Sequence, residues 1–168
     1  ILTRLSFGMN VSLDDVSTTG IRQLTVDEIK LADQLGYTIK LLGIAEEHNG
    51  AVDVCVTPTL LPKTHPLSGV HNENNAVFVL GEAAGETMYY GPGAGGSATA
   101  SAVVSDLIDI ARHAQNSPML GFIKPLEKSG LTLMDKNEIC TQYYIRVSVT
   151  DKIGVLSQIS NILGKHNI

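Results

Sequence analysis

The alternation of apolar and polar residues predicts a β-hairpin early in the chain. Residues 37–48 have the composition of a strand, and in residues 51–57 valine occupies every second position, which gives that strand one buried face. Asn49-Gly50 lies between the two runs, and both residue types accept the positive φ angles of a two-residue hairpin turn. We therefore expect two antiparallel strands here, over residues 37–48 and 51–57.

A helix is predicted immediately before this hairpin. Thr25 and Glu28 have the spacing of a capping box, in which the threonine hydroxyl accepts from the glutamate amide and the glutamate side chain reaches back. Gly36 is placed to end the helix, because glycine adopts the left-handed conformation that often follows a last helical turn.

After the hairpin, the pattern predicts an extended loop, two further strands and a second helix. Three prolines punctuate the loop: Pro58, Pro62 and Pro66. The strands are expected over residues 76–80 and 86–90. The helix is expected from about Thr99 to His113, because its apolar residues recur with the i, i+4, i+7, i+8 spacing of one helical face.

The C-terminal part of the chain predicts a second folding unit. Residues 114–142 show no sustained periodicity and contain several prolines and glycines, which indicates a linker. Residues 143–150 alternate as a strand, residues 151–154 form a turn, and residues 155–165 have the spacing of a helix. Two folding units are expected, and the second is unfinished.

Composition narrows the class of protein. Charged residues make up 17% of the chain, below the roughly 25% of typical soluble domains. Such a chain buries more surface than it can cover alone, which indicates missing domains or a subunit partner. The net charge of −5 and the absence of a Lys/Arg cluster argue against nucleic-acid binding. No apolar run approaches the roughly 20 residues that span a bilayer.

The chain ends and the cysteines add further expectations. Ile1, Leu2 and Leu5 resemble the tail of a buried helix, and the chain stops where a new strand should begin, so both ends look cut. No signal peptide is visible. Cys55 and Cys140 have no CxxC spacing, which predicts free thiols and a cytoplasmic location.

The glycine segment, residues 91–96, is the first candidate for chemistry. Gly91, Gly93 and Gly96 satisfy the G-x-G-x-x-G pattern between a strand and a helix. A complete dinucleotide fingerprint needs a second strand ending in an acidic residue about 20 positions later, and here that region is still helical. Two interpretations stay open: glycine backbone that approaches a ligand or another domain closely, and a tight connection without a ligand.

Other candidates are weaker. Lys40 lies in the first hairpin strand, where partial burial could make it an acid or base, although a surface role is the commoner outcome. The histidines lack the spacing and the cysteine companions of a zinc site, so no metal is expected.

Several ordered motifs resemble homoserine dehydrogenase over residues 1 to about 113. The matching runs are Gly36-Tyr37, Lys40–Ala45, Pro58–Pro62, His65–Leu67, Asn75–Val77, Tyr90–Gly96 and Thr99–Leu107. The end of the chain resembles the first strand and helix of an ACT domain, with the signature Asp151-x-x-Gly154-Val155-Leu156.

The resemblance implies a fold and a division into domains. The fold is α+β: a mixed or antiparallel sheet covered by helices, followed by a partial ferredoxin-like ACT unit. Residues 1–113 would form the substrate and dimerisation domain, with residues 91–113 packing toward an absent nucleotide domain. Residues 114–142 would be the linker and residues 143–168 an incomplete ACT domain. The sheet would make a homodimer.

The resemblance also implies an activity. It is the NAD(P)-dependent interconversion of L-homoserine and L-aspartate 4-semialdehyde, in threonine and methionine biosynthesis. The lysine that protonates the alkoxide and the acidic residues that hold the substrate are expected upstream of Ile1. No catalytic residue is assigned here, and the chain alone is expected to be inactive. NAD(P) is expected in the parent enzyme, without tight binding to this chain.

Site residues follow from the same resemblance. Gly95 is expected to touch the cofactor, with Gly93 and Gly96 as its backbone neighbours, although Ser97-Ala98 replace the bulky residue and proline of many relatives. An effector such as L-threonine would bind near the turn at residues 151–154. The residues expected to bind it are Asp151, Lys152 and Gly154. Two rival interpretations are an amino-acid-sensing regulatory module and a dimerisation domain without a ligand.

Overall fold

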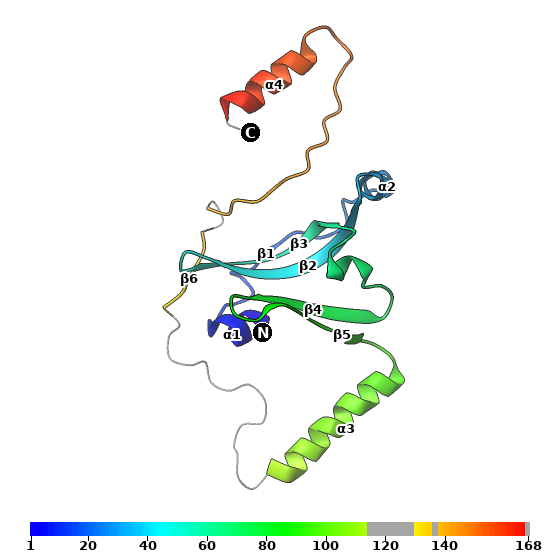
Figure 1. Cartoon of the computed structure of the whole chain (residues 1–168), viewed down its shortest axis with the longest axis vertical. Helices are drawn as coiled ribbons and strands as arrows, with labels where there is room; N and C mark the ends of the chain where they lie inside the picture. The colour runs from blue at the N-terminus through cyan, green and yellow to red at the C-terminus, as the bar shows by residue number, and fades with distance from the viewer. Residues whose placement is uncertain (114–129, 136–137, 167–168) are drawn as a thin grey trace.

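The computed structural model describes residues 1–113, 130–135 and 138–166 and has an α+β architecture (Figure 1). Within these residues a four-stranded mixed sheet has the order β1-β3-β2, with β6 also paired to β3, and β4 and β5 form a separate two-stranded sheet. Figure 1 shows α3 leading away from the end of β5, with α4 at the opposite end of the molecule. The expected α+β class with a mixed sheet is confirmed.

Helix α2 (Val26–Gln34) begins and ends where the sequence predicts. The Thr25 hydroxyl accepts from the Glu28 amide at 3.3 Å, and the Thr25 amide donates to the Glu28 carboxylate at 2.7 Å. This reciprocal capping box satisfies amide groups that have no partner within the helix. Gly36 follows the helix with φ 84°, a left-handed conformation that glycine adopts without steric cost.

The predicted hairpin is the centre of the fold. Strands β2 (Tyr37–His48) and β3 (Ala51–Pro62) pair antiparallel over their full length. Asn49 and Gly50 both have positive φ, 53° and 86°, as the two-residue turn requires. The hairpin prediction is confirmed.

The second hairpin strand is longer than predicted. Pro58 and Pro62 were expected in a loop, but both belong to β3, and Pro58 pairs with Leu41 of β2. Pairing between β1 and β3 ends at Val56. Beyond that residue β3 has a partner on one side only among the described residues, so a proline nitrogen without a hydrogen is tolerated there.

Two short strands complete the mixed sheet. β1 (Ser17–Thr18) and β6 (Thr132–Leu133) each pair parallel with β3. β6 falls inside the segment predicted as a linker, of which residues 114–129 and 136–137 lie outside the described residues. The described part of that segment therefore contributes a strand, because the edge of β3 offers free ladder positions.

The second sheet leads into the glycine segment. β4 (Asn74–Gly81) and β5 (Gly85–Pro92) pair antiparallel and contain the two predicted strands. Between β3 and β4 lies a single 3-10 turn, η1 (Pro66–Gly69). Helix α3 (Gly96–His113) follows β5, three residues earlier than predicted at its start.

The buried apolar side chains lie in the hairpin, where Val52 is fully buried and Leu61 nearly so, and on α2, where Ala32 is nearly buried. Helix α1 (Leu2–Phe7) is present. The prediction that its apolar residues are buried was wrong, because Ile1, Leu2 and Leu5 are all exposed. None of the described helices combines the length and apolar character that a membrane crossing needs.

The C-terminal segment contains the predicted helix but not the predicted strand. Helix α4 (Val155–Lys165) is present and begins after Gly154, whose φ is 89°. The strand predicted over residues 143–150 is not formed: this stretch has no ladder partner within the described residues. Alternation alone does not make a strand, because its backbone groups must pair with a neighbour.

Candidate functional site: the glycine segment and the adjoining hollow

The glycine segment connects β5 to α3 with an open backbone. Gly95 has φ 110°, a conformation that side-chain-bearing residues rarely adopt. A Cβ atom added at Gly95 or Gly96 would meet no atom within 4 Å. These two glycines therefore present bare backbone to open space, next to the first turn of a helix, where unpaired amides attract anionic groups.

Gly93 differs from its neighbours. Its amide donates to the Glu73 carbonyl at 2.8 Å, which extends the pairing of β4 and β5 by one residue. A Cβ atom at Gly93 would lie 1.6 Å from Nδ2 of Asn75. The segment is thus tied to β4 at Gly93 and open at Gly95 and Gly96.

A hollow of about 300 Å³ adjoins this hairpin and is bordered by β2, η1 and β4. The residues that line it are Lys40, Leu41, Leu42, Leu67, Val70, Asn74, Asn75 and Ala76. Its lining combines one ammonium group and two carboxamides with aliphatic side chains. Asn75 belongs both to the hollow and to the contact with Gly93.

Lys40 lines the hollow and is only partly exposed to solvent. Its ammonium group donates to the Val70 carbonyl, the residue that follows η1. This hydrogen bond holds the end of η1 against β2. In this structure Lys40 therefore has a positioning contact, which neither the acid-base nor the surface interpretation of the sequence anticipates.

His65 fixes the start of η1. Its Nδ1 atom accepts from the Leu67 amide at 3.1 Å, and its ring lies 4.9 Å from the ring of Phe78 on β4. The Ser68 hydroxyl, which is buried, donates to the carbonyls of Lys63 and His65. These contacts order the turn that supplies Leu67 to the hollow.

The pKa values of Cys55 and Glu28 are shifted from their ordinary values. Burial, followed by the nearby Asp53 carboxylate, raises the pKa of the Cys55 thiol. Both cysteines are free thiols, as predicted, and Cys140 is exposed. A raised pKa leaves less thiolate at neutral pH, so Cys55 is unsuited to act as a nucleophile.

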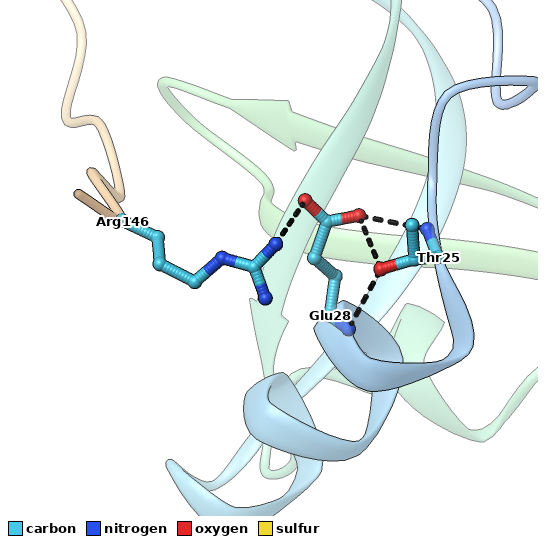
Figure 2. Close-up of polar contacts among 3 residues, drawn as sticks. All are labelled: Thr25, Glu28 and Arg146. Atoms are coloured by element: carbon cyan, nitrogen blue, oxygen red, sulfur yellow. Dashed lines mark hydrogen bonds and ion pairs between the residues drawn. The ribbon is translucent and has the colours of Figure 1, made fainter. Parts of the chain in front are cut away.

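Glu28 is the second perturbed group. Hydrogen bonds from the Thr25 backbone and side chain lower its pKa, with a smaller contribution from Arg146. Figure 2 shows the Arg146 guanidinium reaching the other carboxylate oxygen of Glu28, at 3.5 Å. The pair joins the C-terminal stretch to the start of α2.

The predicted effector turn lies apart from the glycine segment. Asp151, Lys152 and Gly154 are all exposed, and the Val155 amide donates to the Lys152 carbonyl across the turn. The two sets of predicted site residues are on different elements, and no described contact brings them together. Among the described residues, no cluster of His, Cys, Asp or Glu has the arrangement of a metal site.

Asn75 and the hollow are the features that sequence reasoning missed. Asn75 is recognisable only as part of a family motif, and its contact with Gly93 depends on strand register. One sequence signal for this contact is available. The strand opposite Asn75 carries glycine at alternate positions, so a side chain on the neighbouring strand has room to cross that face.

The mixed sheet and the open glycine turn define the class of this molecule: an α+β domain with an exposed backbone edge suited to a ligand or a second domain. A family model described as homoserine dehydrogenase matches residues 1–108. The chain belongs to the homoserine dehydrogenase family, whose members are oxidoreductases.

Individual relatives agree with this assignment. Homoserine dehydrogenases of Bacillus subtilis and Helicobacter pylori are each 44% identical, with 100% of this chain covered. A solved homoserine dehydrogenase from Thiobacillus denitrificans matches 98% of this chain at 35% identity, with a TM-score of 0.74. A Staphylococcus aureus homoserine dehydrogenase structure matches 71% of this chain at 47% identity and a TM-score of 0.60. This chain spans 39% of the length of the two curated relatives.

Proposed function

We propose that this chain is part of an enzyme that interconverts L-homoserine and L-aspartate 4-semialdehyde with NAD(P). The observation that carries the proposal is the family match over residues 1–108, which ends inside α3 and includes the whole glycine segment. The reaction serves threonine and methionine biosynthesis and takes place in the cytoplasm.

The glycine segment fits one edge of a cofactor site. Gly95 and Gly96 have open backbone at the start of a long helix, and any Cβ at these positions would occupy the space that a ligand needs. Gly95 contacts the cofactor, with Gly93 and Gly96 as neighbours. When bound, NAD(P)H supplies the hydride; this chain supplies backbone amides and excludes water along that edge.

The exposed apolar face of α3 supports a second part of the proposal. Val103, Leu107 and Ile110 are each about half exposed, although they form the apolar stripe of an amphipathic helix. We propose that residues 91–113 pack on a nucleotide-binding domain outside this chain. That domain and its adjoining segment supply the lysine acid and the carboxylates that hold the substrate.

The first test is turnover by the chain alone. Purified protein of residues 1–168 should not oxidise NADPH in the presence of L-aspartate 4-semialdehyde, because it lacks the acid and the substrate ligands. The full-length enzyme, assayed in parallel by absorbance at the nicotinamide band, should turn over. Measurable turnover by the chain alone would contradict the assignment of those groups to other sequence.

The C-terminal turn is proposed as part of an effector site in the whole enzyme. Asp151, Lys152 and Gly154 stand at the exposed start of α4, and they belong to a partial ACT unit that binds L-threonine when complete. Calorimetry should detect no L-threonine binding to the chain alone, because the rest of the module is needed. A saturable heat signal would overturn this and favour the amino-acid-sensing interpretation.

A further inference from the structure

Strand register places Asn75 on the same sheet face as Gly91 of β5 and Gly93, which follows the end of β5. Asn75 lies directly opposite Gly91 in the β4–β5 ladder. Gly93 is two residues further along, so its missing side chain would point to the same face as that of Gly91. A side chain on β4 can therefore cross diagonally toward Gly93, because neither glycine obstructs it.

The Asn75 carboxamide occupies this diagonal path. A Cβ atom at Gly93 would lie 1.6 Å from Nδ2 and 2.4 Å from Cγ of Asn75. These separations are far below van der Waals contact, so the carboxamide covers the backbone of Gly93 directly. Any side chain at position 93 must displace it.

No comparable contact exists at the other glycines of the segment. Within the described residues, a Cβ atom at Gly91, Gly95 or Gly96 meets nothing within 4 Å. Gly93 is thus needed for an internal contact, whereas Gly95 and Gly96 are open to a ligand. The same β4 residue also lines the hollow beside Lys40.

We propose that Asn75 is a positioning residue for the cofactor edge. Its carboxamide, laid across Gly93, fixes the path of residues 93–96 between β5 and α3, next to the hydrogen bond from the Gly93 amide to Glu73. The role of Gly93 is to admit Asn75, and it reaches the cofactor only indirectly. This inference rests on the proposed function of the glycine segment.

The test is a double-mutant cycle in the full-length enzyme. Asn75→Ala and Gly93→Ala should each raise the KM and the dissociation constant for NADPH by roughly three- to tenfold, while kcat and the KM for the second substrate change by less than about twofold. The double variant should equal either single variant, because both changes remove the same contact. NADPH binding is measured by its fluorescence, independently of turnover.

Gly20→Ala is the matched control. It adds the same methyl group into open space, at an exposed position without a positive φ that lies outside the glycine segment. It should leave the KM and dissociation constant for NADPH within about twofold of the parent values. Thermal unfolding of every variant reports any general loss of folding.

Three outcomes overturn the inference. If the fold-changes in NADPH binding of the two single variants multiply in the double variant, Gly93 contacts the cofactor independently of Asn75. Unchanged NADPH binding in Asn75→Ala would mean that the carboxamide positions nothing, and this variant decides the question even if Gly93→Ala does not fold. Failure of the unsubstituted enzyme to use NAD(P) with L-homoserine would instead remove the proposed function and this inference with it.

Discussion

At the scale of single residues, hydrogen bonds govern the ionisation of Glu28 more than its charged partner does. The Thr25 amide and hydroxyl donate to one carboxylate oxygen at 2.7 and 2.9 Å, while Arg146 reaches the other at 3.5 Å. All three groups favour the carboxylate form, and the Thr25 backbone has the largest effect on the pKa.

Removing the Thr25 side chain or the Arg146 side chain should therefore raise the pKa of Glu28, and the two increases should differ. Thr25→Ala should raise it more than Arg146→Ala does, and in both variants the pKa should stay below its ordinary value because the backbone hydrogen bond remains. Thr25→Ser, which keeps the hydroxyl, is the control. A carbon-13 NMR titration of the Glu28 carboxyl group measures all four proteins.

The sign of the effect on stability follows from the lowered pKa. The folded state binds the Glu28 proton less tightly than the unfolded state, so the stabilising contribution is complete above the ordinary pKa. It is lost as pH falls through the lowered, folded-state pKa. A larger pKa change in Arg146→Ala than in Thr25→Ala would show that the ion pair dominates instead.

At the scale of elements, the β2–β3 hairpin depends on its turn. Gly50 has φ 86°, and its carbonyl accepts from Thr132, so the same residue closes the hairpin and anchors β6. Val52, the fully buried residue, lies opposite Glu47 of β2 and Leu133 of β6. The turn and the core residue are thus neighbours in one small structural unit.

Gly50→Ala should lower the free energy of unfolding by about 1–2 kcal/mol, because a Cβ atom clashes with the backbone in the left-handed conformation. Gly20→Ala is the matched control: that position is open and has no positive φ, so its change should stay within about 0.5 kcal/mol. Urea unfolding measures both. Equal stability of the two variants would mean that the turn can rearrange without cost.

At the scale of the whole molecule, apolar surface remains uncovered. Leu41 and Tyr37 of β2, Tyr89 of β5 and Leu107 of α3 are all exposed. Such exposed apolar side chains offer surface that another subunit or domain can bury. The low content of charged residues, 17%, agrees with this expectation.

A dimer through the sheet should therefore form in solution. Multi-angle light scattering should give twice the monomer mass of 17.9 kDa at high protein concentration. Replacing Leu41 with Glu should shift the equilibrium toward monomer, because a buried unpaired carboxylate is costly; Leu13→Glu, in an exposed loop outside the sheet, should not. A strictly monomeric species at every concentration would refute the prediction.

The sequence by itself determined those elements whose signals are local. The Thr25 and Glu28 capping box and the Asn49-Gly50 turn each depend on neighbouring residues, and each occurs where predicted. The strand-to-helix change also falls at the glycine segment, although α3 begins three residues earlier than predicted. Local conformational preference was sufficient in these places, because the hydrogen bonds involved span only a few residues.

Tertiary structure decided whatever depends on a distant partner. Pro58 is in a strand because β2 supplies its pairing partner. Residues 143–150 form no strand because the described part of the chain supplies no neighbouring strand. Thr132 belongs to a strand because it pairs with the edge of β3. The Asn75 contact with Gly93 belongs here too, because it depends on the register of β4 and β5. Register sets which side chains share a face, and it is settled only when both strands are in place.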